Sequence, residues 1–482
     1  MEVSMAPFSV VLSVVLVSVV ACAWRVLNWV WLRPKKLEKC LRQQGLAGNS
    51  YRLWSGDLKE ISMMLKEAVS KPMNLSHDTA PRVVPYAHQS VSTFGKNSFI
   101  WFGPTPRVNI TNPEDLKNIF TKHEDFPKPA LSPLVKLLLT GLANYGGEKW
   151  AKHRKIIKPA FHSEKLKRML PAIYQSCSEM IEEWESLVSK ESSYELDVWP
   201  YLQNMTADVI SRTSFGSSYK EGREIFQLLK LQIELTVKMK HSVYIPGWRF
   251  LPTKTNKRLK EVDKEIRELF MGIINKREEA IKAGEAAKDD LLGQETTSIL
   301  LVWTMVLLSE NQNWQDRARE EVLQVFGGNK PDFDGLNHLK VVTMILLEAL
   351  RLYPSSFTLS RMIHKKTQFA EFSLPAGVGI SLPTILIHHD KELWGDDATQ
   401  FKPERFAEGV SKATKNKLTY FPFGGGARIC IGQNFAMMEA KLAVALILQH
   451  FTFKLSPSYA HAPSGITFLQ PQFGAHIVLH KL

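Results

Sequence analysis

The feature that most constrains this chain is a glycine-rich turn that holds one cysteine and runs directly into an apolar helix. The turn reads Phe421-Pro-Phe-Gly-Gly-Gly-Ala-Arg-Ile-Cys-Ile-Gly, and the predicted helix follows over 433–448. A cysteine just before a helix gains thiolate character, because the helix N-terminus and the amides of the turn favour a negative charge. The turn therefore predicts that Cys430 is a soft ligand for iron.

The residues around Cys430 favour a flat, anionic cofactor. Glycines let the backbone approach a macrocycle closely, and Arg428 can meet a propionate. One alternative is that Cys430 is only a small buried hydrophobe, as single cysteines commonly are. A second alternative, a phosphate-binding loop, fails because the glycine spacing does not match the dinucleotide pattern.

The same turn resembles the haem-binding signature of the cytochrome P-450 superfamily. The matching residues are Phe423, Gly426, Arg428, Cys430 and Gly432. The resemblance implies haem b with Cys430 as the axial ligand of the iron, and it implies that the other four residues bind the cofactor.

Three further matches follow the order of that superfamily. Glu348 and Arg351 resemble its Glu-x-x-Arg helix, and Arg405 resembles the arginine that joins this pair. The implied role is structural, holding the cysteine turn against the haem. Such a pair is usually a solvated contact, but the flanking leucines favour burial, where removal of one partner is costly.

The other two matches concern residues that would hold the haem propionates and residues that would deliver protons. Trp150 and Arg154 resemble the helix residues that hold the propionates, and their i, i+4 spacing places them on one helical face. The alternative is an ordinary basic amphipathic helix. Glu295 and Thr296 resemble the pair that delivers protons for dioxygen cleavage, although a threonine inside a helix also bonds back to its own backbone without any function.

Nearly the whole chain resembles family 72 of the plant cytochromes P-450, the family of secologanin synthase and several triterpenoid oxidases. The resemblance implies a monooxygenase that uses dioxygen and electrons from NADPH-cytochrome P-450 reductase to oxidise a small apolar terpenoid, iridoid or triterpenoid. Pocket candidates are Leu131, Leu134, Leu137, Leu138 and the segment 355–359. Leucine-rich loops are more often plain packing.

The chain departs from that family before Gln294. Several tens of residues are missing there, and Leu292 stands where the family has alanine. About 17 helical residues remain, roughly 25 Å of distal helix, and a cavity or local disorder should follow. Two other functions therefore stay open: a haem-binding but catalytically impaired splice form or degenerate copy, and a haem-thiolate isomerase that acts on peroxides.

The expected fold is mainly α with minor β sheets, the cytochrome P-450 fold with a shortened distal helix and an N-terminal transmembrane helix. No residue from Pro7 to Trp24 is charged, and continuation to Trp31 reaches the ~20 residues that a bilayer span needs. Tryptophans and then basic residues follow, as at a membrane interface. We expect an anchor over 1–32 and a haem-thiolate domain over 33–482, single-pass in the endoplasmic reticulum with the domain in the cytoplasm. A cleaved signal peptide is disfavoured because no basic segment precedes the run.

Composition limits the partners. The net charge of +13 suits membrane lipid or an acidic protein, and no fingerprint for nucleic acid is present, so no nucleic acid is expected. Lys152, Lys155 and Lys158 are candidates for the face that receives the reductase, or simply a solvated helix face. Periodicity predicts helices over 113–122, 147–157, 164–187, 204–213, 222–240 and 258–283, with an early sheet near 99–111 and strands after 465.

Overall fold

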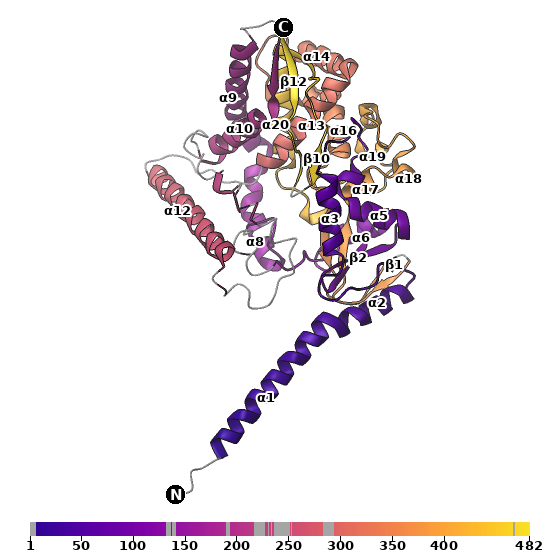
Figure 1. Cartoon of the computed structure of the whole chain (residues 1–482). Helices are drawn as coiled ribbons and strands as arrows, with labels where there is room; N and C mark the ends of the chain where they lie inside the picture. The colour runs from indigo at the N-terminus through magenta and orange to yellow at the C-terminus, as the bar shows by residue number, and fades with distance from the viewer. Residues whose placement is uncertain are drawn as a thin grey trace.

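The computed structural model is mainly helical with small sheets, as predicted, and one long N-terminal helix projects from the body (Figure 1). The structure describes residues 6–131, 136, 141–188, 193–215, 227–229, 231–232, 234–235, 251, 253–282, 294–369, 371–465 and 468–482.

The helices before Gln294 are α1 (Ala6–Leu27), the π-helical turn η1 (Asn28–Leu32), α2 (Arg33–Gln43), α3 (Leu58–Ala68), α4 (Ala80–Val83), α5 (Pro85–Phe94), α6 (Pro113–Thr121), α8 (Gly147–Ile157), η2 (Lys158–Phe161), α9 (Ser163–Val188), α10 (Val198–Ile210), η3 (Ser211–Phe215) and α12 (Lys254–Lys282). The later helices are α13 (Gln294–Glu310), α14 (Gln312–Phe326), α15 (Phe333–His338), α16 (Lys340–Leu352), α17 (Thr384–His388), α18 (Lys391–Trp394), η5 (Pro403–Phe406), α19 (Val410–Ala413), η6 (Gly426–Arg428) and α20 (Gln433–His450).

Most of the helix predictions agree with these bounds to within a few residues. The exception is the helix predicted over 204–213, which begins earlier, at Val198 of α10. Its start is set by Asp197, whose carboxylate accepts a hydrogen bond from the Trp199 amide and so caps the first turn. Most of the predicted helix 222–240 lies outside the described residues, as do 283–293 with Leu292 and the pocket candidates Leu134, Leu137 and Leu138.

The described strands form two larger sheets and two short pairs. The five-stranded sheet has the order β1-β2-β3-β8-β5, and the three-stranded sheet has the order β4-β12-β9. The strands are β1 (Ala47–Gly48), β2 (Ser98–Phe102), β3 (Thr105–Asn109), β4 (Tyr194–Asp197), β5 (Leu359–Met362), β6 (Thr367–Gln368), β7 (Ser373–Leu374), β8 (Gly379–Leu382), β9 (Phe451–Leu455), β10 (Pro463–Gly465), β11 (Leu469–Pro471) and β12 (His476–Lys481). The predicted early sheet and C-terminal strands are thus both present.

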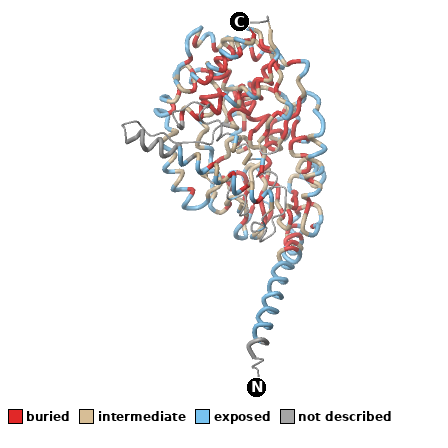
Figure 2. Tube along the Cα trace, turned by 60° about the vertical axis from the view of Figure 1, so that its left-hand side comes forward, coloured by how far each residue is buried: buried red, intermediate tan, exposed pale blue. Residues whose placement is uncertain are grey.

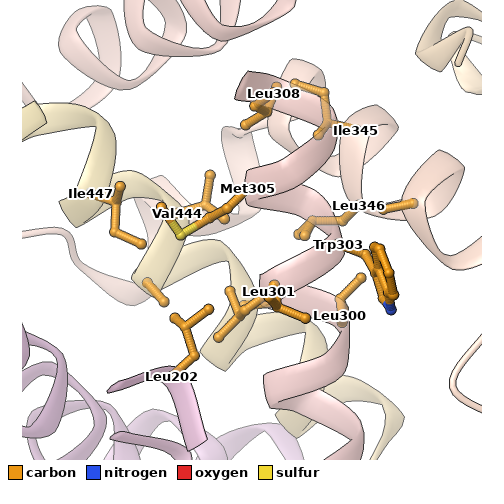
Figure 3. Close-up of a cluster of buried hydrophobic side chains, with 14 of the residues drawn as sticks. Leu202, Leu300, Leu301, Trp303, Met305, Leu308, Ile345, Leu346, Val444 and Ile447 are labelled. Atoms are coloured by element: carbon orange, nitrogen blue, oxygen red, sulfur yellow. The ribbon is translucent and has the colours of Figure 1, made fainter. Parts of the chain in front are cut away.

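The core forms around α13, which has 17 residues, the length expected for the shortened distal helix. Side chains of α13 interdigitate with those of α10, α16 and α20, as Leu301, Met305 and Val444 illustrate (Figure 3). Every residue from Thr297 to Ser309 is buried. The shortened helix therefore remains a central core element of the fold.

The N-terminal helix contrasts with this core. From Val10 to Gln43 the chain is helical, and its apolar part is long enough to cross a membrane. The residues of this helix before the body are exposed (Figure 2). A helix that exposes so many valines and leucines to its surroundings fits the predicted transmembrane segment.

Candidate active site

The cysteine turn is closed by its own backbone hydrogen bonds. The Cys430 amide donates to the Phe423 carbonyl at 2.9 Å, and the Gly424 amide donates to the Phe421 carbonyl at 2.9 Å. Cys430 stands two residues before Gly432, which precedes the first residue of α20. The turn thus holds the cysteine at the N-terminus of a buried helix, as the sequence predicts.

The surroundings of the Cys430 thiol act on its pKa in opposite directions. Burial raises its pKa above the usual range, although the Gly432 amide and the positive charge of Arg154 both lower it. The Gly432 amide thus favours the thiolate as the sequence predicts, while desolvation opposes it. Cys430 would hold an iron ion as the thiolate, and Gly432 and Arg154 would favour that charge.

The glycines of the turn serve packing against α6. A Cβ atom added to Gly425 would lie 3.0 Å from the Phe120 ring, and one added to Gly426 would lie 2.0 Å from the Phe120 carbonyl oxygen. Gly426 also has φ +62°, a left-handed conformation that favours glycine. Gly426 thus allows the turn to seat on Phe120, a contact that the sequence pattern did not predict.

Two of the predicted cofactor-binding residues meet at Trp150. The guanidinium carbon of Arg428 lies 4.4 Å from the centroid of the Trp150 ring, and that of Arg154 lies 5.7 Å from it. Arg154 also donates to the Ile429 carbonyl at 2.9 Å, and Arg428 donates to the Tyr145 carbonyl at 3.0 Å. The helix α8 and the cysteine turn, more than 270 residues apart in sequence, are joined at this point.

Two more cations that the sequence analysis missed belong to the same place. Burial and the charges of Arg361 and Arg428 lower the pKa of Lys128 to about 8. Burial and the charge of Arg428 lower the pKa of Arg361 to about 10. Neither residue lies in a motif, because Lys128 follows α6 in an irregular segment and Arg361 is a single basic residue on β5. Only the tertiary fold brings them to Arg428.

This basic cluster, Lys128, Arg154, Arg361 and Arg428, fits a group that carries two negative charges. Within the described ranges, no carboxylate forms an ion pair with any of the four. The Nε atoms of Arg361 and Arg428 are buried without a hydrogen-bond partner in the protein. Buried cations require compensation, and the two propionates of haem would supply it beside the cysteine turn. The residues present therefore fit haem.

The predicted structural triad forms a buried network. Arg351 donates from Nε to Glu348 Oε2 at 2.8 Å and from Nη2 to Glu348 Oε1 at 2.7 Å. Arg405 Nε lies 3.5 Å from Glu348 Oε1, and the side chains of Glu348 and Arg351 are 0% exposed. Arg405 also pairs with Asp397, where Lys402 and Arg405 outweigh the effect of burial and hold the pKa of the carboxyl at about 2.

His388 connects this network to the cysteine turn. Its Nδ1 lies 3.2 Å from the Arg351 carbonyl oxygen, and its Nε2 accepts a hydrogen bond from the Phe421 amide at 3.2 Å. Burial lowers the pKa of His388 well below its usual range, and the charge of Arg351 lowers it further. A neutral imidazole can donate from one nitrogen and accept at the other. The sequence analysis missed His388, because two adjacent histidines, His388 and His389, at the end of a short helix form no recognisable pattern.

The proposed proton-delivery pair lies in the first turn of α13. Glu295 and Thr296 are both half-buried there, and the Ser355 hydroxyl donates to the Thr296 carbonyl at 3.2 Å. Ser355 begins the predicted pocket segment 355–359. The structure therefore joins the start of the shortened helix to that segment.

Glu439 of α20 lies beside Thr297 of α13 and yields a pH-dependent prediction. It is fully buried, and burial raises its pKa well above the ordinary value of 4.5, although the Thr297 side chain favours ionisation. An acid that is neutral when folded and ionised when unfolded costs stability above its unfolded pKa, and the cost grows with pH. Relative to the parent chain, Glu439→Gln should gain up to ~1.4 kcal/mol in free energy of unfolding per pH unit above that value.

This prediction is checked by urea denaturation of both proteins in micelles at about pH 5 and about pH 7. A difference between the two proteins that does not change with pH would contradict it.

Comparison with known proteins agrees with this geometry. The family model for cytochrome P450 matches residues 82–293 and 291–477. A retinoic acid-bound cyanobacterial protein, CYP120A1, has the same fold, with a TM-score of 0.70 over 82% of this chain and 94% of that chain at 24% identity. The fold and the cysteine turn thus define a haem-thiolate oxidoreductase of the monooxygenase class.

Relatives identify the family more closely. Cytochrome P450 CYP72A219 of Panax ginseng is 57% identical over 504 residues, which cover 97% of each chain. Cytochrome P450 72A15 of Arabidopsis thaliana is 54% identical over 514 residues, which cover 100% of each chain. The chain belongs to family 72 of the cytochromes P450, and it binds haem through a cysteine thiolate.

The same comparisons bear on the missing segment. The alignment with the Arabidopsis relative has 514 positions and this chain has 482 residues, so at least 32 positions face a gap in this chain. The two parts of the family match meet at 291–293, immediately before Gln294. This is where the sequence analysis predicts the deletion.

Proposed function

We propose that this chain oxidises a small apolar terpenoid, an iridoid or a triterpenoid, with electrons from NADPH-cytochrome P450 reductase. We further propose that residues 1–32 anchor it in the endoplasmic reticulum membrane and that residues 33–482 form the haem domain on the cytoplasmic side. The observation that carries the proposal is the position of Cys430 beside the basic cluster, in a fold shared with family 72. The apolar N-terminal helix supports the anchor.

The proposal assigns roles to the residues of the site. Haem iron with a thiolate ligand supplies dioxygen activation, because the thiolate pushes electron density that favours O–O cleavage. Cys430 would hold the iron, while Trp150 and Arg154 of α8 and Arg428 of the cysteine turn would bind the propionates. Glu295 and Thr296, in the first turn of α13, would supply protons for the reaction.

Phe423, Gly426 and Gly432 shape the turn around the cysteine. Glu348, Arg351 and Arg405 support the cysteine turn through His388, which accepts a hydrogen bond from the Phe421 amide. In the part of the chain that the structure describes, His388 links this network to the turn, so the role of the network is positioning.

The basic cluster predicts a measurable effect on haem retention. Arg361→Ala should remove one charge-assisted hydrogen bond to a propionate, worth ~1.5–3 kcal/mol, and should therefore speed haem loss by about 10- to 100-fold. The measurement is the rate of haem transfer from the purified protein to an excess of apomyoglobin. The matched control is Arg267→Ala on α12, where the arginine pairs with Asp263 at 3.0 Å on an exposed surface. Equal rates for the two variants would contradict the proposed role.

Activity is tested with the full chain, the reductase and NADPH in microsomes. Iridoid and triterpenoid candidates are supplied under isotopically labelled dioxygen, and products are examined for one labelled oxygen atom. A labelled terpenoid product that requires NADPH is the expected result. Labelled products from other apolar compounds only would overturn the terpenoid assignment.

A second candidate function follows from the short length of α13, which begins at Gln294. The two parts of the family match meet just before this residue. In this candidate the chain binds haem but is catalytically impaired. A normal thiolate spectrum with no product from any substrate would favour it. Insertion before Gln294 of the segment that the relatives have and this chain lacks would then be expected to restore turnover.

A further inference from the structure

A cluster of aromatic and titratable side chains lies in the core beside α13. The indole of Trp303 on α13 (Figure 3) and the phenol ring of Tyr353, the residue after α16, stack with centroids 4.2 Å apart and planes 10° apart. Both side chains are 1% exposed. The Trp303 indole nitrogen donates to the Leu469 carbonyl at 2.7 Å, which holds the ring in place. The two π systems are therefore in fixed contact.

The hydroxyl of Tyr353 has a base as its partner. It lies 2.8 Å from His77 Nδ1, and His77 Nε2 lies 3.5 Å from the Glu310 carboxylate. An ionised carboxylate only accepts hydrogen bonds, so Nε2 carries the imidazole proton and Nδ1 accepts from the phenol. Burial lowers the pKa of His77 to about 4. The imidazole is therefore neutral near pH 7 and can take up a proton.

Tyr459 and His461 form a second pair of the same kind. The Tyr459 hydroxyl lies 2.9 Å from His461 Nδ1, and His461 Nε2 lies 3.1 Å from the Ser76 carbonyl oxygen. Since a carbonyl only accepts, Nε2 carries the proton and Nδ1 accepts from the phenol. The His461 ring packs edge to face against the rings of Trp303 at 5.9 Å and Tyr353 at 6.3 Å. Both phenol–imidazole pairs thus contact the Trp303–Tyr353 stack.

The stack lies near the residues proposed for proton delivery. Thr296 and Trp303 are both on α13, ~10 Å apart along its axis at 1.5 Å per residue. Ser355, two residues after Tyr353, donates from its hydroxyl to the Thr296 carbonyl at 3.2 Å. At the other end of the cluster Glu310, the last residue of α13, is exposed. The cluster therefore extends from the neighbourhood of Thr296 to the protein surface.

This arrangement couples loss of an electron to loss of a proton. Burial raises the pKa of Tyr353 well above its ordinary value, so the phenol stays protonated. When an electron leaves Tyr353, the phenolic proton passes to His77 Nδ1, and the proton on Nε2 can pass on to Glu310. The O–H bond of the phenol breaks and an N–H bond forms, which leaves a neutral phenoxyl radical at Tyr353.

We propose that Trp303, Tyr353 and Tyr459 form an electron relay that supplies the haem site when a hydroperoxide is reduced there without substrate. Reduction of one hydroperoxide to an alcohol and water consumes two electrons and two protons. The two phenols release the same number, one electron and one proton each, and Trp303 passes the electrons along α13. The relay rests on the placement of haem near Thr296 and is independent of the terpenoid assignment.

Packing alone does not account for this cluster. A buried tyrosine or tryptophan needs a hydrogen-bond partner for its polar atom, and a backbone carbonyl would satisfy each hydroxyl. Tyr420 is such a case, because its hydroxyl donates to the Leu347 carbonyl at 2.8 Å. A carbonyl in this position does not take up the phenolic proton. Tyr353 and Tyr459 instead both face a neutral imidazole nitrogen, which can.

The test uses the purified, haem-loaded full chain in detergent micelles without substrate. Hydrogen peroxide is added, samples are frozen within milliseconds, and electron paramagnetic resonance spectra are recorded with natural and ring-deuterated tyrosine. The variants are Tyr353→Phe, Tyr459→Phe and His77→Gln, the last of which keeps the phenol and removes the base. The matched control is Tyr420→Phe, next to the cysteine turn.

The parent chain should give a signal that narrows on deuteration of tyrosine, as a tyrosyl radical does. Tyr353→Phe and His77→Gln should each lower its intensity several-fold, and Tyr459→Phe should lower it in part, while Tyr420→Phe leaves it unchanged. Bleaching of the haem by peroxide should be several-fold faster in Tyr353→Phe than in the parent chain. Full signal in both Tyr353→Phe and His77→Gln would overturn the relay.

The carbon monoxide difference spectrum of each protein separates failure of the relay from failure of the haem site. A parent chain with the thiolate band but without a tyrosyl signal overturns the relay alone. A parent chain without the band overturns the haem site and the relay together. If Tyr353→Phe does not bind haem, His77→Gln decides the outcome, because it keeps the stacked phenol.

Discussion

Cys430→Ser should abolish the red-shifted Soret band of the reduced, carbon monoxide-bound protein while leaving the polypeptide folded. The band reports a thiolate trans to carbon monoxide, and serine offers a harder, far more basic oxygen in its place. The measurement is the difference spectrum of microsomes at matched protein level, with circular dichroism of the purified variants as the control for folding. Monooxygenase product should disappear together with the band.

Cys177→Ser is the matched variant for this experiment. Cys177 is also a single cysteine, but it is fully buried between α9 and α10, with its sulfur 3.6 Å from that of Met205. The Cys177→Ser variant should retain the band, with an intensity in proportion to the amount of folded protein. Persistence of the band in Cys430→Ser, or its selective loss in Cys177→Ser, would refute the assignment of the iron ligand.

Arg351→Met should lower the free energy of unfolding by ~3–5 kcal/mol, because it leaves the buried carboxylate of Glu348 without its main partner. The guanidinium also donates to the carbonyls of His388 at 2.8 Å and Gln400 at 3.1 Å, which would lose these bonds. Since domains are stable by about 5–15 kcal/mol, the variant should accumulate poorly and incorporate little haem. Urea denaturation in micelles measures the effect.

The matched control for this prediction is Arg258→Met on α12. Arg258 also pairs with two carboxylates on its own helix, Glu261 at 3.3 Å and Glu265 at 3.0 Å, but all three side chains are exposed. Its loss should cost less than ~1 kcal/mol. If Arg351→Met were no more destabilising than this control, the network would not support the cysteine turn in the manner inferred.

Prediction from sequence was most successful where one short segment carries its own chemistry. The turn around Cys430, the Glu348–Arg351 pair and the apolar N-terminal run each have local patterns, because the spacing of a few residues decides which face of a helix they share or which turn they form. The length of α13 was predicted for the same reason, since helical periodicity from Gln294 onward is visible in the chain itself.

Residues that act only through the fold could not be predicted in this way. Lys128 and Arg361 join the basic cluster, and His388 links Arg351 to Phe421, from segments with no motif of their own. The pKa of Cys430 likewise depends on how much protein surrounds the turn, which outweighs the local effect of the helix N-terminus.

The sequence by itself therefore predicted the iron ligand, the helix-rich class and the long apolar N-terminal helix, since these follow from residue types at short spacing. The tertiary structure alone decided which distant cations meet beside the cysteine and what holds the turn in place. The physical reason is the range of the interactions. Helical faces and turns depend on neighbours within a few residues, whereas burial and charge clusters depend on segments that only folding brings together.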